Sequence, residues 1–443
     1  MKILITNIQQ TNILNLIMHE TLRITIIGGG YVGLVTGTCL AHLGHHVTIV
    51  DVDKNKVDAI NAKIPPIYEE GLSELLEKYV GDTLSASTNY DSVSESDVIF
   101  IAVGTPPNED GSANLTYIRQ AAENIASELE KRHAKFPVVV VKSTVPPGTT
   151  RDIVYQVLAA KLSDSEFGIC MNPEFLREGR AIEDFLNPDR IVIGSTDEKT
   201  KEIMNAVYKK LEAPILYTGS TAAEMIKYTA NAFLATKISF SNEIGNLCKQ
   251  LGVNVYEVMQ GVGLDHRISP HFLNAGVGFG GSCFPKDVSA LASLADRIGT
   301  NPILLHAVLE VNDEQPNKIV KLLEQRISDL KGKQIAILGL AFKDNTDDIR
   351  ESRSIPVINS LLEKGAVPVC YDPMASENMK QIFHDISYKE SAKEALTDAD
   401  ACLVMTEWPE FSKLRDEFYL MKTRIIIDGR HILTISDAEG VCW

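Results

Sequence analysis

Residues 22–33, LRITIIGGGYVG, decide the fold of this chain. The apolar, β-branched run is typical of a buried strand, and Gly28, Gly30 and Gly33 follow it with G-x-G-x-x-G spacing. The next residues have helical spacing, and residues 45–53, HHVTIVDVD, form a second apolar run. Strand, glycine turn, helix and strand together predict a βαβ unit of the Rossmann type.

The glycine turn predicts a dinucleotide site. The first glycine allows the tight turn, the second lets a pyrophosphate approach the backbone, and the third lets helix and strand pack closely. Asp51 ends the next strand, where a carboxylate can accept the ribose hydroxyls and, together with Asp53, repel a 2′-phosphate. We therefore expect NAD rather than NADP. Lys54 and Lys56 could attract a 2′-phosphate and so weaken this preference, unless they are solvated. The alternative to a dinucleotide site is a glycine turn with a purely structural role.

Composition narrows the class of protein. A chain of 443 residues with 44% apolar and 23% charged residues predicts a globular protein of several domains. The net charge of −16 argues against nucleic acid or an anionic membrane as the main partner. The 7 cysteines are scattered without metal-binding spacing, so we expect no metal and a cytoplasmic location. We find neither a signal peptide nor a membrane span, and translation could begin at Met18.

The order of the remaining segments predicts the architecture. Further apolar strands alternate with helices, and residues 220–252 form one long helix that opens with a capping box from Thr221 to Glu224 and ends near Gly252. Its apolar and small residues suggest burial at a domain or subunit interface. The fold class is therefore α/β, with two Rossmann-like doubly wound domains joined by a long central helix and a helical dimerisation region. The expected divisions are an N-terminal extension at 1–20, a nucleotide domain at 21–217, a helical region at 218–330 and a second α/β domain at 331–443.

Residues 276–287, GVGFGGSCFPKD, predict a reactive cysteine. The glycines allow the backbone to lie against a ligand, and positive charge or N–H donors near Cys283 would stabilise its thiolate. Lys286 and Asp287 follow closely. The other cysteines are expected to be inert core residues.

Polar residues elsewhere are candidates for the same chemistry. Lys227 and Asn231 are spaced i, i+4 on the long helix, so they share a face and could hold an oxyanion, although a surface pair is the simpler interpretation. Thr144 and the pair Glu174 and Glu178 follow predicted strands, whose carboxyl ends face the ligand crevice of a doubly wound sheet. Capping or turn formation is the alternative for each of them.

The chain resembles the UDP-glucose/GDP-mannose dehydrogenase family from about residue 23 to about residue 430. The blocks that carry the resemblance are GGGYVG, PIYEEGL, VGTPP, KSTVPPGTT, NPEFLREG, EMIKYTANAFLA, GFGGSCFPKD and LAFKDNTDDIRES. It implies that carbon 6 of a nucleotide sugar is oxidised from alcohol to carboxylate through a cysteine thioester while two molecules of NAD are reduced. The glycine-loop block and the last block look most like the UDP-glucose branch, while GDP-mannose and UDP-N-acetylhexosamine remain open.

The resemblance also implies roles for individual residues. Cys283 matches the nucleophile, Lys227 and Asn231 match oxyanion-stabilising residues, and Asp287, Glu174 and Thr144 match groups that assist hydrolysis and proton transfer. The residues matching cofactor contacts are Gly28, Gly30, Tyr31, Val32, Gly33, Asp51, Lys56, Thr105, Thr144, Glu178, Cys283 and Arg350, the last from a neighbouring subunit. The residues matching substrate contacts are Glu174, Phe175, Leu176, Lys227, Asn231, Arg267, Phe272, residues 274–280 with Asn274, Gly278 and Gly280, Phe342, Lys343 and Arg430. Arg267 would reach across a dimer interface.

Three departures from the family pattern and two competing functions remain. Ser269 stands where the family usually has glycine, TVPPGT has a second proline where many members have another residue, and the extension before about residue 20 has no counterpart. A hydroxyacid dehydrogenase that performs a single oxidation would share the fold but needs no thiol, so Cys283 argues against it. A non-catalytic NAD-binding protein would not need Lys227, Asn231, Cys283 and Asp287 together.

Overall fold

The computed structural model describes residues 21–132 and 136–443. It forms two compact units, Met1–Thr229 and Ala230–Trp443, and each is described by itself. The expected extension at 1–20 and the alternative start at Met18 lie outside the described residues. The four-part division expected from the sequence stays a prediction. In the described part of the chain, no helix is long and apolar enough to cross a membrane.

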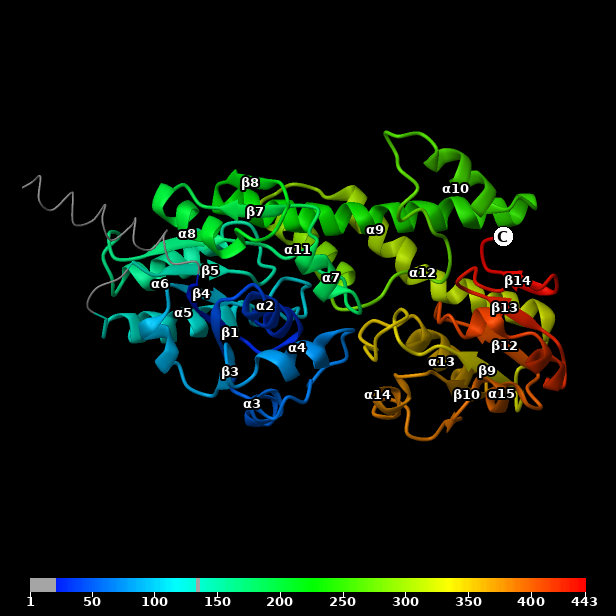
Figure 1. The fold of residues 1–443 in the computed structure, drawn as a ribbon. Helices are drawn as coiled ribbons and strands as arrows, with labels where there is room; N and C mark the ends of the chain where they lie inside the picture. Colours follow the sequence, from blue (N-terminus) through cyan, green and yellow to red (C-terminus); the bar gives the residue numbers. More distant parts are fainter. Residues whose placement is uncertain (1–20, 133–135) are drawn as a thin grey trace, which may run out of the picture. The chain divides into compact units, whose positions relative to one another are not determined.

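The first unit is built on an eight-stranded sheet with the order β3-β2-β1-β4-β5-β6-β7-β8 (Figure 1). Its strands are β1 (Arg23–Ile27), β2 (His46–Val50), β3 (Leu84–Ser87), β4 (Val98–Ile101), β5 (Val138–Val141), β6 (Gly168–Met171), β7 (Ile191–Gly194) and β8 (Ile215–Thr218). Its helices are α2 (Tyr31–His42), α3 (Lys54–Asn61), α4 (Leu72–Tyr79), α5 (Thr116–Leu129), α6 (Tyr155–Ala159), α7 (Ala181–Leu186) and α8 (Glu198–Tyr208), with a 3₁₀ turn at Asp91–Glu95 and a π-helical turn at Thr150–Val154.

The strands bury both faces, as a doubly wound sheet requires. Ile26 and Phe100 belong to the core on one face, and Ile27 and Ile101 belong to the core on the other. This separation follows from the alternation of side chains along a strand. The strands from β3 to β6 are parallel, but β6 and β7 pair antiparallel. The expected parallel sheet is therefore confirmed for its first six strands, and the last two run in the opposite direction.

Helix α9 (Ser220–Leu251) confirms the long central helix, and its end at Gly252 matches the expected stop. Gly252 has φ +69°, a left-handed conformation that commonly terminates a helix. The predicted capping box from Thr221 to Glu224 is wrong. The helix already begins at Ser220, and the carboxylate of Glu224 accepts hydrogen bonds from the backbone N–H groups of Gly148 and Thr150 at 2.5 and 2.7 Å.

The second unit contains a six-stranded parallel sheet with the order β11-β10-β9-β12-β13-β14, which repeats the arrangement of the first six strands of unit one. Its strands are β9 (Gln334–Leu338), β10 (Val367–Tyr371), β11 (Ser387–Tyr388), β12 (Ala401–Val404), β13 (Ile426–Asp428) and β14 (Ala438–Gly440). The helices beside it are α13 (Ser354–Glu363), α14 (Ser376–Lys380) and α15 (Ala392–Leu396), with 3₁₀ turns at Phe411–Lys413 and Asp416–Leu420.

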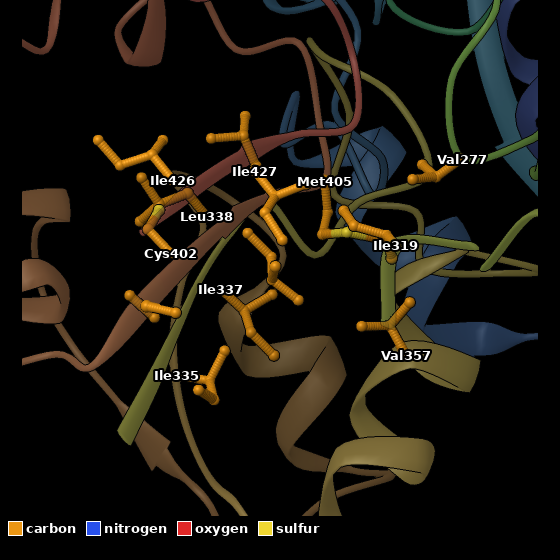
Figure 2. Close-up of a cluster of buried hydrophobic side chains, with 14 of the residues drawn as sticks. Val277, Ile319, Ile335, Ile337, Leu338, Val357, Cys402, Met405, Ile426 and Ile427 are labelled. Atoms are coloured by element: carbon orange, nitrogen blue, oxygen red, sulfur yellow. The ribbon is translucent and has the colours of Figure 1, made fainter. Parts of the chain in front are cut away.

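One large core ties this sheet to the helical segments of the same unit. Figure 2 shows side chains of β9, β12 and β13 beside Ile319 of α12, Val357 of α13 and Val277 of the glycine loop. The helical segments in this core are α10 (Val255–Gly263) and α12 (Ile303–Arg326). Helix α11 (Phe284–Arg297) packs in a separate small cluster with Phe279 and Val308. Because Val277 is fully buried in this core, the glycine loop is attached to the sheet of the second unit.

Candidate functional site

In the first unit, the polar candidates gather along one edge of the sheet. The glycine turn follows β1, Asp51 follows β2, Thr105 lies after β4, Thr144 lies after β5 and Glu174 lies after β6. The carboxyl ends of parallel strands meet at the same edge, which is where a doubly wound sheet binds its ligands. The side chain of Thr105 donates a hydrogen bond to the carbonyl of Thr144 at 2.9 Å, which links two of these loops.

The turn glycines have the distinct properties that dinucleotide binding requires. Gly28 has φ +107°, and a Cβ at Gly33 would lie 1.9 Å from the carbonyl oxygen of Gly28. A Cβ at Gly30 would meet no atom within 4 Å, so the backbone there has open space beside it. Gly30 is also the N-cap of α2, whose first N–H groups are unsatisfied within the helix. The turn therefore fits a pyrophosphate in the way expected from the sequence.

Asp51 is held at the turn by its own backbone contacts. Its carboxylate accepts hydrogen bonds from the N–H groups of Gly29 and Asp53 at 2.7 and 2.8 Å. These bonds fix the side chain where a ribose would lie beside the β1–α2 turn. Lys54 pairs with Asp58 and is exposed, which confirms that it is solvated, while Lys56 is half-buried.

Glu174 and Lys227 form a buried ion pair. Lys227 Nζ lies 3.0 Å from the Glu174 carboxylate, and the two side chains are only 4% and 6% exposed. Burial raises the pKa of Glu174, but attraction to Lys227 and the hydrogen bonds from Leu176 and Lys227 together outweigh burial and hold the pKa below its usual range. The carboxylate also accepts the N–H of Leu176 at 2.6 Å, and the ring of Phe175 lies against Arg190. The simpler interpretation of Lys227 as a surface residue is wrong.

Lys142 was not singled out from the sequence. It is buried, and its Nζ donates to the side-chain oxygen of Asn172 at 3.0 Å. Desolvation lowers the pKa of Lys142 to about 8, although attraction to Glu174 acts in the opposite direction. The sequence does contain a sign of this residue, because Lys142 directly follows four consecutive valines that are typical of a buried strand. A lysine at the end of such a strand needs a polar partner.

In the second unit, Cys283 is the N-cap residue of α11. It is exposed, whereas the other six cysteines are buried, which confirms the expected inert core thiols. Oriented N–H groups at a helix N-terminus stabilise a thiolate. The hydroxyl of Ser282 lies 3.6 Å from the sulfur.

Asn231 and Asp287 lie together beneath this helix start. The side-chain amide of Asn231 donates to the Asp287 carboxylate at 2.6 Å, and Lys286 pairs with the same carboxylate. Asp287 is 1% exposed and Asn231 is 6% exposed. The surface interpretation of Asn231 is therefore also wrong. Asp287 lies one helical turn from Cys283 along α11, and its hydrogen bond holds Asn231 of α9 in one arrangement.

The glycine loop is fixed mainly by long polar side chains. Asn312 of α12 accepts from the N–H of Phe279 at 2.7 Å and donates to its carbonyl at 3.0 Å. Arg430 donates to the carbonyl of Gly278 at 3.0 Å. A Cβ at Gly281 would lie 2.6 Å from the ring of Phe342. Other segments of the same unit therefore lie close to these glycines, and the expected approach of a ligand to the loop stays a prediction.

The remaining substrate candidates are distributed around this loop and beyond it. Phe342 and Arg430 contact the loop, and a Cβ at Gly280 would meet the backbone of Glu351. Phe272 has φ +64°, and its ring lies edge-on to Phe284. Asn274 is exposed. Arg267 and Arg350 are exposed and paired with their neighbours Asp265 and Asp348, and Lys343 is half-buried beside the ring of Phe342.

Comparison with known proteins decides the family. Residues 22–212 match the NAD binding domain of the UDP-glucose/GDP-mannose dehydrogenase family, residues 221–314 match its central domain, and residues 336–435 match its UDP binding domain. The chain belongs to the UDP-glucose/GDP-mannose dehydrogenase family. This family membership makes the chain an NAD-dependent oxidoreductase, which confirms the expected cofactor and enzyme class.

Relatives within the UDP-glucose/GDP-mannose dehydrogenase family cover nearly the whole chain. The UDP-glucose 6-dehydrogenase AglM of Haloferax volcanii is 47% identical over 93% of this chain and 97% of its own. A UDP-glucose dehydrogenase structure from Pyrobaculum islandicum is 42% identical with a TM-score of 0.91, covering 96% of this chain and 98% of that one. The UDP-N-acetyl-mannosamine dehydrogenase Cap5O of Staphylococcus aureus is 26% identical with a TM-score of 0.81, covering 95% and 98%.

Proposed function

We propose that this enzyme oxidises UDP-glucose to UDP-glucuronate with two molecules of NAD. The observation that carries the proposal is an exposed thiol at the N-terminus of α11, one helical turn from the buried Asn231–Asp287 pair. A dehydrogenase that stopped at the aldehyde would need no nucleophile, whereas oxidation to the acid does. The similarity to enzymes named for UDP-glucose supplies the substrate.

The chemistry assigns a distinct task to the thiol. NAD accepts one hydride in each of the two oxidations. The first leaves an aldehyde at carbon 6, and the Cys283 thiolate then adds to that carbon to give a thiohemiacetal. Loss of the second hydride converts the thiohemiacetal to a thioester bound to Cys283. Water attacks this thioester, the carbon–sulfur bond breaks, and the carboxylate product and the thiol are released.

The surrounding residues would control charge and protons. Lys227 and Asn231 stabilise the oxyanion of the thiohemiacetal, because a cation and an amide N–H both favour a developing negative charge. Glu174 or Asp287 assists the hydrolytic water as a base, and Thr144 helps to order it. Asn231 holds Asp287 at 2.6 Å, which supports a shared role for this pair.

The binding residues would divide between the two units. In the first, the glycine turn, Asp51 and Glu178 hold NAD. In the second, the UDP binding domain and the glycine loop hold the nucleotide sugar, with Phe342, Lys343 and Arg430 around it. Arg267 and Arg350 are proposed to reach a neighbouring subunit, which agrees with their exposure.

A second candidate substrate is a UDP-N-acetylhexosamine. The similarity to Cap5O favours it, but at 26% identity that similarity is lower than the 47% identity to AglM. The purified enzyme should be assayed for NADH production with UDP-glucose, GDP-mannose and UDP-N-acetylmannosamine. UDP-glucose should give the highest kcat/KM and about two NADH per sugar acid. A higher kcat/KM with either of the other sugars would replace the proposed substrate.

We also propose that the enzyme is a homodimer or a larger assembly of identical subunits. Phe233, Phe240 and Leu247 are spaced seven residues apart on α9, which places them on one face of the helix. They are 64%, 51% and 54% exposed. Large exposed apolar side chains that recur along one face of a helix are typical of a subunit interface, and a second copy of the chain presents the same face.

A further inference from the structure

The segment PIYEEGL, residues 66–72, has no role in the reaction proposed above. It lies between α3 and α4 and places Glu69 in the interior, where the residue is 6% exposed. The next residue, Glu70, is exposed. Burying a carboxylate is unfavourable unless hydrogen bonds compensate for the lost water. The partners of Glu69 therefore indicate what it holds in place.

Glu69 contacts two parts of the first unit at once. One carboxylate oxygen accepts the N–H of Gly179 at 2.8 Å, and the other accepts the N–H of Ala181 at 2.6 Å. The hydroxyl of Tyr31 also donates to Glu69, and it accepts from Gly179 at 2.8 Å. Burial raises the pKa of Tyr31, so its hydroxyl stays protonated and remains a donor at neutral pH.

These partners belong to both sides of the expected NAD site. Tyr31 is the first residue of α2, next to the turn that would receive the pyrophosphate. Gly179 lies at the end of the β6–α7 loop and Ala181 begins α7, while Glu178, the expected nicotinamide contact, directly precedes Gly179. The first turn of α7 also needs acceptors for its N–H groups, and Glu69 supplies one. The carboxylate thus joins the pyrophosphate turn to the loop that carries Glu178.

We propose that Glu69 is a positioning residue for NAD, which holds the Glu178 loop against the N-terminus of α2. The inference rests on the proposed placement of NAD at the β1–α2 turn. Without Glu69, the loop would have to be ordered when the cofactor binds, and that ordering would weaken binding. Glu69 does not touch the reacting atoms, so its loss should affect NAD binding more than the chemical steps.

The test compares Glu69→Gln with Glu70→Gln in the full chain. Glutamine keeps the shape of the side chain but replaces one acceptor oxygen with a donor, so at least one N–H loses its partner. The Kd of NAD, measured by calorimetry without any sugar, should rise about tenfold in Glu69→Gln, as expected for one lost buried hydrogen bond. The KM for NAD should rise similarly, with a smaller change in kcat. Glu70→Gln should behave as the unmodified enzyme.

Tyr31→Phe provides the independent check. This variant keeps the ring and removes only the hydroxyl that contacts Glu69, so it should also raise the Kd. Because Glu69 and the Tyr31 hydroxyl bond to each other and share the N–H of Gly179, the double variant should bind NAD about as weakly as Glu69→Gln alone. If the fold-increase in Kd of the double variant equals the product of the two single fold-increases, the proposal is overturned. It is also overturned if Glu69→Gln and Glu70→Gln have the same Kd. If Glu69→Gln does not fold, an unchanged Kd in Tyr31→Phe overturns it.

Asp51→Ala separates this inference from the proposed function. If NAD binds elsewhere, neither Asp51→Ala nor Glu69→Gln changes the Kd, and the placement of the cofactor is wrong. If Asp51→Ala weakens binding and Glu69→Gln does not, only the role of Glu69 is wrong. The identity of the sugar does not enter, because no sugar is present in the binding measurement.

Discussion

Cys283 gives the sharpest test at the scale of single residues. Cys283→Ser should bind NAD and UDP-glucose normally but lose net acid formation by at least roughly a thousandfold, because a hydroxyl is the weaker nucleophile and its ester hydrolyses slowly. The measurement is NADH formed per sugar acid, together with detection of a covalent adduct by mass spectrometry. Cys248→Ser, at a buried cysteine, is the control. Acid production at the normal rate by Cys283→Ser would exclude the covalent mechanism.

Asp51 tests the choice of cofactor. Asp51→Ala removes the carboxylate that we propose accepts the ribose hydroxyls, so the KM for NAD should rise about tenfold and the preference over NADP should fall. The check is kcat/KM with each cofactor, and the control is Asp58→Ala, at an exposed residue of α3. If the unmodified enzyme used NADP as efficiently as NAD, the role of Asp51 would be refuted.

The candidate residues show what spacing can and cannot predict. Gly28, Asp51 and Cys283 were found because each belongs to a local pattern in the sequence. The burial of Lys227 was missed, because i, i+4 spacing fits a surface pair equally well and its partner Glu174 is distant in the sequence. Lys142 was missed for the same reason, because its partner Asn172 lies 30 residues further along the chain, directly after β6.

At the scale of elements, long apolar runs were predicted well and short ones were missed. The sequence reveals β1, β4, β5 and β9, whose residues form continuous apolar stretches. It does not reveal β3, LSAS, or β8, which have weak patterns and lie at the edges of the sheet. Nor does it reveal the antiparallel pairing of β7, because direction is set by tertiary contacts rather than composition.

The loop after α10 predicts a stabilising substitution. Ser269 has φ +68°, a left-handed conformation that costs about 1–2 kcal/mol for residues other than glycine. Ser269→Gly should remove that strain. The greater conformational freedom of glycine in the unfolded chain should offset about 0.5–1 kcal/mol of this gain. The free energy of unfolding should therefore rise by about 0.5–1 kcal/mol, measured by urea denaturation. Ser165→Gly, at an exposed serine without positive φ, should be neutral or destabilising. Destabilisation by Ser269→Gly would contradict the strain.

The end of β5 predicts a dependence of stability on pH. Lys142 has its pKa lowered to about 8 by desolvation, from 10.5. Between these values the unfolded chain binds the proton and the folded chain does not, so this residue adds stability as the pH rises from about 8 to 10.5. Lys142→Met removes the titrating group. Between pH 8 and 10.5, the free energy of unfolding of the unmodified enzyme, measured by urea denaturation, should rise by about 1–3 kcal/mol more than that of the variant. A constant difference would show that the amine does not titrate in this range.

At the scale of the whole molecule, two sheets with the same order of strands have different chemistry at the same position. Asp372 follows β10 as Asp51 follows β2. One oxygen of Asp372 accepts from the N–H groups of Leu340 and Ala341 and from the indole of Trp408, at 2.7–3.0 Å. The other oxygen accepts from the N–H groups of Met374 and Ala375, both at 2.8 Å. Each oxygen of Asp372 therefore already has at least two donors and is not available to a ribose, whereas each oxygen of Asp51 has one within the described part of the chain. The shared order of strands alone would predict a dinucleotide site at each sheet. The hydrogen bonds of Asp372 argue against such a site at the second sheet, so we expect only the one at the first.

Assembly is the other property of the whole molecule that can be tested. Phe240→Asp places a charge in the apolar face of α9, so the dimer should dissociate at concentrations where the unmodified enzyme is associated. Sedimentation velocity across a range of concentrations measures this. Tyr117→Asp, at an exposed aromatic residue of α5, is the control. Full activity in a species shown to be monomeric would contradict the proposed assembly.

The contrast between one exposed thiol and six buried ones has a practical consequence. Under native conditions, a thiol-specific reagent such as a maleimide dye should modify one site per chain, without prior removal of the other cysteines by mutagenesis. The same contrast makes the enzyme vulnerable to oxidants, since peroxide would reach its nucleophile before any other cysteine. A bound nucleotide sugar should shield that sulfur. The rate of labelling would then report how much of the site is occupied, in real time and without turnover.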